Sequence, residues 1–197
     1  MKTQVIDQVP APSVQITSAL PTWKINERRV RELVLHMARR LEVNSLEIHV
    51  TFVGPAAMRK INSQFRNKDQ STDVLSFPQM EWVTPRLIAQ SSTEKKPSKE
   101  IARNSQMLRG TKKGLVSFDH EKFLGDIIIC LDAAKKNARE DGHDVAREVC
   151  FLLAHGILHL CGHDHQKPAE KDLMFKQQET LMNDLVGKWN ACVRKVT

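Results

Sequence analysis

Four histidines lie within residues 155–165, and three of them, His155, His159 and His165, have the spacing of metal ligands. His155 and His159 are four residues apart, so on a helix their imidazoles project from one face, one turn apart. Gly162 allows the chain to turn, which brings His165 back as a third ligand. Three neutral imidazoles leave one tetrahedral position open for water, which is typical of catalytic rather than structural zinc sites. We therefore predict one zinc ion, or another divalent transition metal, per chain on these histidines.

The spacing of these histidines matches the HExxHxxGxxH pattern of metzincin proteases, with one change. Gly156 stands where those proteases carry the glutamate that takes a proton from the zinc-bound water. A metal ion alone still lowers the pKa of water from about 15.7 to about 7. The sequence therefore predicts a site that generates a nucleophile but lacks the proton acceptor of a peptidase.

A second candidate for chemistry is Arg66, which ends a predicted helix and precedes a polar loop. Pro55 suits the first turn of that helix, whose apolar residues recur at helical spacing. An arginine at this position can clamp a phosphate with two hydrogen bonds and stabilise charge that develops in a transition state. It can equally be a C-terminal arginine that interacts with the helix dipole. The position alone leaves both interpretations open.

The apolar pattern predicts the elements that must position these side chains. Strict alternation over residues 46–53 indicates a half-buried strand, and residues 124–131 are typical of a fully buried one. A helix is expected from about 144 to 160, carrying the first two histidines, and Pro168 opens a final amphipathic helix. The remaining predicted elements are strands at 14–17 and 73–77 and helices from residues 26 and 55.

The length of 197 residues is enough for one domain with its own hydrophobic core. A hydrophobic content of 41% and a charged content of 27% are ordinary for a globular protein. We find neither an internal repeat nor a convincing domain boundary. The mixed order of β and α elements therefore suggests one domain over residues 1–197, a single α+β or α/β layer structure.

The four cysteines are scattered, without a CxxC pair or a disulfide-like framework. We expect reduced and mostly buried thiols, including Cys161, which is interpreted as a core residue facing away from the metal. No apolar stretch approaches the length of a membrane span, and residues 1–20 lack the hydrophobic segment of a signal peptide. These features predict a cytoplasmic protein.

The net charge of +7 and the pI of about 9.4 favour a polyanionic partner, RNA or DNA. Nearly all of the excess lies in residues 86–113, where eight basic and two acidic residues give a net charge of +6. This stretch belongs to the long irregular segment 79–123. The middle of that segment is rich in Ser, Lys and Thr, and it is expected to be a mobile surface loop.

Three sequence motifs resemble those of the YbeY endoribonuclease family. Residues 155–165 resemble the family signature HGxLHLxGxDH. Residues 65–66 and 72–78 together resemble a second motif, and residues 124–127 resemble a third. The motifs occur in the family's order and cover the chain from about residue 48 to residue 185, and the first is highly specific.

The resemblance implies an α+β fold: a compact domain with a mixed β-sheet packed against helices and the metal at one end of a cleft. It implies that zinc binds His155, His159 and His165 and that Arg66 is catalytic, acting on the phosphate. The implied activity is that of a single-strand-specific, metal-dependent endoribonuclease in rRNA processing, notably maturation of the 16S rRNA 3′ end, and in ribosome quality control. The implied partners are single-stranded rRNA and the ribosome or its small subunit with assembly proteins.

The segment 79–123 is longer than the corresponding stretch in most members of that family, and no functional residue of the family can be transferred into it. Its charge and polar composition support the hypothesis of an arm that contacts RNA or the ribosome. The alternative is a solvated loop that the surface tolerates.

The sequence does not identify a general base. His163 and Asp164 lie nearby, although Asp164 is better interpreted as a residue that orients a ligand imidazole or caps the turn. Two other functions stay open: a metallopeptidase, against which Gly156 argues, and a ribosome-assembly factor whose zinc is mainly structural or regulatory. The open fourth coordination position argues against a purely structural metal.

Deletion of residues 90–113 tests the predicted RNA contact of the basic segment. If its lysines and arginines neutralise phosphates, the plot of log K against log salt for RNA binding becomes shallower, by about 0.7 for each single-strand phosphate that is no longer neutralised. The measurement is a salt titration of RNA binding by the intact and the shortened protein. An unchanged slope contradicts the predicted role and leaves the solvated-loop interpretation.

Overall fold

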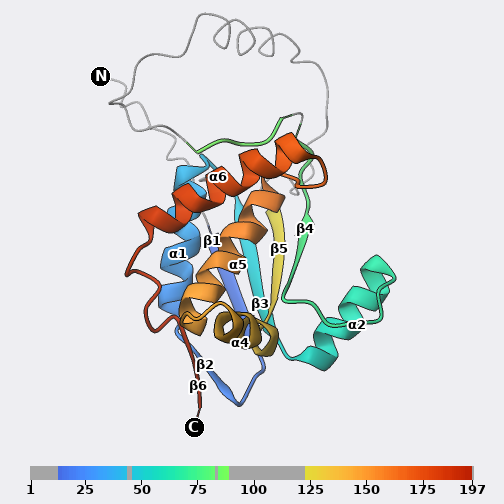
Figure 1. Ribbon diagram of the computed structural model, residues 1–197, viewed down its shortest axis with the longest axis vertical. Coiled ribbons are helices and arrows are strands. Elements are labelled where there is room, and N and C mark those ends of the chain that lie inside the picture. The colour runs from blue at the N-terminus through green and yellow to red at the C-terminus, as the bar shows by residue number, and fades with distance from the viewer. Residues whose placement is uncertain (1–12, 44–45, 83, 89–122, 197) are drawn as a thin grey trace, which may run out of the picture.

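A four-stranded β-sheet forms the centre of the molecule, with helices packed against it (Figure 1). The computed structural model describes residues 13–43, 46–82, 84–88 and 123–196. β1, β3 and β5 run parallel, and β4 pairs antiparallel with β5, so the sheet is mixed, as expected. In spatial order the strands are β1 (Ser13–Ser18), β3 (Glu47–Val53), β5 (Phe123–Cys130) and β4 (Val74–Pro78).

Alternation along the strands gives the sheet one fully buried face. Val50 of β3 lies beside Ile127 of β5, and Phe52 lies beside Ile129; all four side chains are at most 1% exposed. Helices α1 (Glu27–Arg40) and α5 (Val145–Leu160) contribute to the same hydrophobic core. The residues that alternate with these buried ones along β3 and β5 are half-buried, and their side chains belong to the other face of the sheet.

Helix α5 is the central helix of the fold. It packs on β4 and β5 and also contacts α1, α4 (Leu131–Glu140) and α6 (Pro168–Asp184), which crosses over it in Figure 1. Helix α2 (Pro55–Arg66) lies beyond the β4 edge of the sheet (Figure 1) and forms a separate small cluster in which Met58 meets Leu75 and Cys130. These layers confirm the α+β class.

The predicted helices and longer strands are confirmed to within one or two residues at their ends. Two strands were not predicted: β2 (Trp23–Ile25) and β6 (Val193–Lys195), which pair as an antiparallel ribbon. Each strand has only three residues, and the partners are separated by almost the whole chain, so no local pattern indicates the pairing. The ribbon ties the start of the described chain to its end.

The first part of segment 79–123 is irregular but packed. Ile88 is 8% exposed, and its backbone N–H donates to the side chain of Gln177 on α6, at 2.8 Å. Trp82 packs against the main hydrophobic core. Residues 79–82 and 84–88 are therefore part of the folded body, whereas residues 89–122, where the basic arm was predicted, lie outside the described residues.

All four cysteines are buried and unpaired, as predicted. Cys161 belongs to the main hydrophobic core, and among the described residues it is not part of the group of potential ligands that the three histidines form. Burial raises the pKa of its thiol to about 12. Among the described helices, none combines the length and the apolarity needed to cross a bilayer.

Two glycines let α5 and β4 approach β5 closely. A Cβ on Gly156 of α5 would lie 2.8 Å from the Ile127 side chain of β5. A Cβ on Gly125 would lie 2.3 Å from the carbonyl oxygen of Phe77 and 2.9 Å from Leu160, and Gly125 also has a φ of +143°. Glycine is therefore required where the sheet meets the C-terminal half of α5.

Substitution of Gly125 by alanine tests this close approach. We expect Gly125→Ala to lower the free energy of unfolding by about 2–5 kcal/mol, because the strain of a positive φ adds to overpacking against backbone. The control is Gly187→Ala, since Gly187 has a φ of +74° but no atom within 4 Å of an added Cβ. Its cost should stay at about 1–2 kcal/mol, the strain alone. The free energies of unfolding are measured by urea denaturation. An equal loss of this free energy in Gly125→Ala and Gly187→Ala would contradict the role of close packing at Gly125.

Candidate metal centre

Helix α5 exposes one row of side chains to solvent. Over residues 146–160 every side chain is buried except those of Arg147, Phe151, His155 and His159. These four positions recur every four residues, so they lie along one side of the helix, about 6 Å apart along its axis. In this row, which we call the α5 row, two predicted metal ligands are followed towards the N-terminus of the helix by an aromatic and a basic side chain.

The three predicted ligands come together at the C-terminal end of this row. One potential ligand atom from each of His155, His159 and His165 lies within 4.8 Å of the other two. The Nε2 atoms of His155 and His159 are 3.1 Å apart. The ring of His165 lies 5.4 Å and 5.1 Å from those of His155 and His159, between ring centres. The structure thus brings together the side chains that the sequence pattern selects.

Hydrogen bonds at Nδ1 set the tautomers of two of these rings. Nδ1 of His159 lies 3.0 Å from the carbonyl oxygen of His163. A carbonyl oxygen can only accept a hydrogen bond, so Nδ1 must be the donor. Nδ1 of His155 lies 3.1 Å from Oε1 of Gln178, whose Nε2 is directed to the carbonyl of Phe151 at 3.4 Å. Both Nδ1 atoms therefore carry the proton, and both Nε2 atoms present a lone pair to the centre.

This arrangement fits a divalent metal ion. Two unprotonated nitrogens that face each other at 3.1 Å repel unless a cation lies between them. Nitrogens bound tetrahedrally at about 2.0–2.1 Å from one zinc ion are separated by about 3.3 Å, close to the observed distance. The ligand set and its outer hydrogen bonds are those that zinc-binding histidines typically have.

Burial keeps the two tethered imidazoles neutral. Desolvation lowers the pKa of His155, and desolvation together with the neighbouring His155 lowers the pKa of His159 to about 4. Neutral imidazole is the form that binds metals, and near neutral pH these two rings need not lose a proton first.

The turn after α5 is held by the segment that follows β4. The indole Nε1 of Trp82 donates to the carbonyl of Leu160 at 2.8 Å, and a Cβ on Gly162 would lie only 2.8–3.0 Å from the Trp82 side chain. Nε2 of His163 lies 2.6 Å from the carbonyl oxygen of Arg86. Trp82 and Arg86 therefore fix the turn that returns His165 to the site, a role that the sequence pattern did not indicate.

The two candidates for a general base, His163 and Asp164, both make structural hydrogen bonds. His163 is 3% exposed and its Nε2 is bonded to a backbone carbonyl, so its side chain is structural. Asp164 accepts a hydrogen bond from the backbone N–H of His165 at 2.7 Å and so caps the turn, as predicted. Neither side chain is thus placed as a free base.

Gly156 faces the sheet rather than the metal. Because an added Cβ would already meet Ile127 at 2.8 Å, the core has no room there for a glutamate. The catalytic glutamate of a metzincin therefore has no place at this position, which argues against peptidase chemistry by that route.

Arg66 is the last residue of α2, which ends where Asn67 adopts a left-handed conformation with φ of 55°. The preceding Phe65 packs edge-on against Phe77 of β4, with 5.1 Å between ring centres. Arg66 is exposed, and among the described residues it has no ion pair and no contact with the three histidines. Its guanidinium is free to bind an anion, and its contact with a phosphate stays a prediction.

A buried polar network links the start of β4 to α4 and α5. Nδ2 of Asn137 donates to Asp73 at 2.9 Å and lies 3.4 Å from Glu148, whose other oxygen lies 3.3 Å from Nε2 of His143. Asp141, His143 and Glu148 are close enough to hold a metal; Nε2 of His143 lies 3.3 Å from Glu148 and 3.9 Å from Asp141, and Nδ1 lies 3.2 Å from the carbonyl of Asp144. Burial raises the pKa of Glu148. Asp73, from the second motif, therefore has a structural role here.

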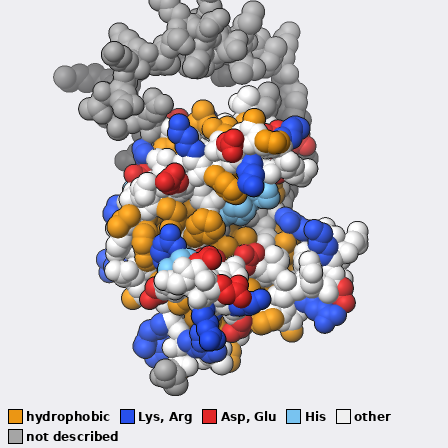
Figure 2. Space-filling view, in the orientation of Figure 1, with side chains coloured by type: hydrophobic (Ala, Val, Ile, Leu, Met, Phe, Trp, Pro, Cys, Tyr) orange, Lys and Arg blue, Asp and Glu red, His pale blue; other side chains and the backbone are white. Residues whose placement is uncertain are grey.

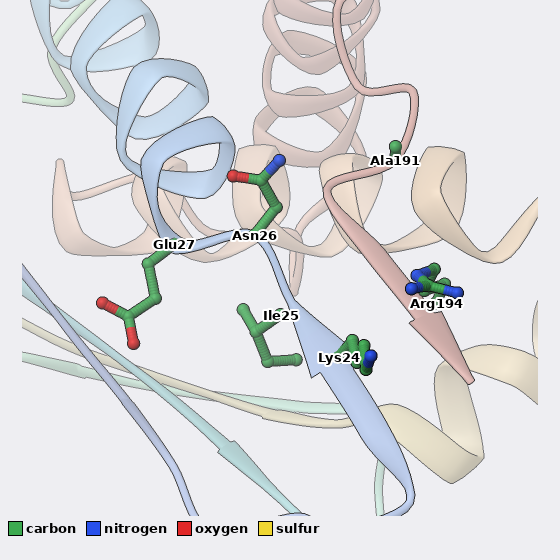
Figure 3. Close-up of a pocket in the computed structure, with 6 residues that line it drawn as sticks. All are labelled: Lys24, Ile25, Asn26, Glu27, Ala191 and Arg194. Carbon is green, nitrogen blue, oxygen red and sulfur yellow. The ribbon is translucent and has the colours of Figure 1, made fainter. Parts of the chain in front are cut away.

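A separate hollow of about 540 Å³ lies at the β2–β6 ribbon. Figure 3 shows Lys24 and Arg194 side by side on its two strands, with Glu27 pointing away from them. None of its lining residues is a histidine or a predicted catalytic residue. This hollow is therefore not part of the metal centre.

Comparisons with known proteins agree with these observations. A model of the family "Endoribonuclease YbeY" matches residues 15–186. The chain is 34% identical to the endoribonuclease YbeY of Limosilactobacillus reuteri, over 86% of this chain and 92% of that protein. It is 31% identical to that of Clostridium botulinum strain 657, over 81% and 89%. A solution structure of TM1509 from Thermotoga maritima shares the fold, with a TM-score of 0.54 at 22% identity over 90% of this chain and 92% of that one.

Removal of the Gln178 amide tests its role in orienting His155. We expect Gln178→Leu to weaken zinc binding about 10- to 100-fold, as loss of an outer hydrogen bond to a ligating histidine typically does. Gln177→Leu is the control, because Gln177 bonds the backbone of Ile88 rather than a histidine. The measurement is competition with a zinc chelator. Equal affinities of the two variants would contradict the role of Gln178.

The lowered pKa of His159 predicts a pH dependence of stability in the metal-free protein. Unfolded histidine takes up a proton near pH 6.5 but folded His159 only near pH 4, so between these values the unfolded state binds more protons. The free energy of unfolding should therefore fall as the pH drops from 6.5 to about 4. In His159→Gln this slope should be smaller. Urea denaturation with chelator present measures it, and parallel curves for the two proteins would refute the prediction.

Proposed function

The chain belongs to the YbeY endoribonuclease family, and we propose that it is a zinc-dependent endoribonuclease that cleaves single-stranded ribosomal RNA. The observation that carries this proposal is the pair of unprotonated Nε2 atoms on His155 and His159, 3.1 Å apart, with both Nδ1 atoms tethered. His165 completes a set of three imidazoles, and three protein ligands typically leave a fourth tetrahedral position for water.

In the proposed mechanism the three histidines and Arg66 have separate roles. His155, His159 and His165 would hold a divalent ion, which would supply Lewis-acid chemistry for a water molecule and a phosphodiester oxygen. Gln178 and the carbonyl of His163 hold the ligand rings in the binding tautomer. Arg66 binds the phosphate through its guanidinium and offsets the negative charge that grows in the transition state.

The biological setting belongs to the same proposal. We assign the protein to the cytoplasm, to maturation of the 3′ end of 16S rRNA and to ribosome quality control, with the ribosome or its small subunit and assembly proteins as partners. The net charge of +7 supports a polyanionic partner. The basic segment 86–113 supplies most of that charge and is the proposed contact with RNA outside the active site.

The two alternative functions, metallopeptidase and ribosome-assembly factor, require different features of the site. A metallopeptidase needs a carboxylate base, and the position that provides it in metzincins is packed against Ile127 here. A ribosome-assembly factor with a structural or regulatory zinc needs no open coordination position. The proposed enzyme therefore differs from both in requiring His159 and Arg66 for RNA cleavage.

Cleavage of a single-stranded ribosomal RNA fragment by purified variants tests the function. We expect His159→Ala to lose the metal and the activity, and Arg66→Glu to retain the metal but lose activity by at least about 100-fold, the usual cost of removing a charge-stabilising donor. Metal content is measured on each sample, and a peptide-cleavage screen accompanies the RNA assay.

Two matched controls accompany these variants. His36→Ala removes a half-buried histidine of α1, and Lys60→Glu makes the same charge reversal as Arg66→Glu elsewhere on α2. Both should cleave RNA like the wild type. Identical cleavage by all five proteins would mean a contaminating nuclease and would favour the assembly factor, whereas peptide cleavage would favour the peptidase.

A further inference from the structure

A groove between α5 and α6 adjoins the metal centre. It has a volume of about 360 Å³, within the range of small-molecule sites. Two phenylalanines stand at its surface: Phe151 of α5 is 38% exposed and Phe175 of α6 is 46% exposed. In Figure 2 hydrophobic side chains adjoin the histidine patch. The groove is lined by Arg147, Phe151, Phe175, Gln178, Glu179, Met182 and Asn183.

The lining has the chemistry that an unpaired nucleobase needs. Phe151 and Phe175 offer aromatic faces for stacking, and Glu179 and Asn183 offer acceptors and donors for the edge of a base. Arg147 has no ion pair among the described residues and lies at the end of the groove away from the histidines. The ammonium of Lys171 lies 5.5 Å from the centre of the Phe175 ring, which adds positive charge at the rim.

The groove is continuous with the metal centre. Gln178 lines the groove and also bonds His155, so the two sites share a residue. Along the α5 row, Arg147, Phe151 and His155 follow one another at intervals of about 6 Å. A strand whose phosphate lies at the histidines can therefore place an adjoining base on Phe151 and a phosphate farther along the strand near Arg147.

We propose that this α5–α6 groove is a nucleotide subsite that stacks one unpaired base beside the scissile phosphate. The proposal rests on the ribonuclease function and names the part of the substrate that the enzyme reads. A base paired in a duplex cannot leave its stack to enter the groove without breaking its pairing. The groove thus supplies a physical reason for a preference for single strands.

The test compares intact RNA with RNA that carries one abasic nucleotide, placed on either side of the scissile phosphate. The proteins are the metal-loaded wild type, Phe151→Leu and Phe175→Leu, and kcat/KM and binding are measured for each. Leucine keeps an apolar side chain in the groove but removes the aromatic face. Leu173→Ala is the control, because Leu173 is an exposed apolar residue of α6 outside the groove.

We expect Phe151→Leu to lower kcat/KM on intact RNA about 5- to 100-fold, the range for removing one base-stacking interaction. With the wild type, kcat/KM on one of the two abasic RNAs should be lower than on intact RNA by a similar factor. On that same abasic RNA, Phe151→Leu should have the same kcat/KM as the wild type. Phe175→Leu follows the same pattern, so the comparison stands if one variant folds poorly.

Wild-type activity that is equal on intact and abasic RNA would overturn the subsite alone, as would full activity in both leucine variants. Failure of the metal-loaded wild type to bind or cleave any single-stranded RNA would overturn the proposed function, and the subsite with it.

Discussion

The close approach of α5 to β5 is the constraint on which the rest of the molecule depends. Gly156 lets the helix lie against Ile127, where any larger residue would overlap the core. With that side of the helix pressed on the sheet, only one row of α5 stays accessible. His155 and His159 belong to that row, so the packing of the core determines that both ligands face solvent on the same side.

The same close approach decides which chemistry the site supports. A glycine that is needed for packing cannot be replaced by the glutamate that serves metzincins as a base, so the site has the three histidines but lacks the carboxylate. The remaining polar groups fix the ligands instead. Gln178 from α6 and the turn carbonyl of His163 orient the imidazoles, and Trp82 and Arg86 hold that turn.

The sequence predicted the parts of the structure that have a local signature. The histidines follow from their spacing on one helix and one turn, and the strands of the main sheet follow from their alternation. Gln178 carries no such signature, because its partner His155 lies 23 residues away on another helix. The structural use of His163 depends on Arg86, 77 residues away, and the β2–β6 ribbon joins opposite ends of the chain. Such pairings depend on tertiary packing, which residue periodicity does not encode.

In the proposed metal centre, three imidazoles that are oriented by their hydrogen bonds bind one divalent ion through nitrogen and leave one coordination position open. X-ray absorption spectroscopy of the protein loaded with one zinc per chain tests this arrangement most directly. We predict three nitrogen ligands and one oxygen at about 2.0–2.2 Å, with no sulfur. A sulfur ligand at about 2.3 Å would bring a cysteine such as Cys161 into the site, and four protein ligands would close it. Either result would contradict an open, catalytic metal centre.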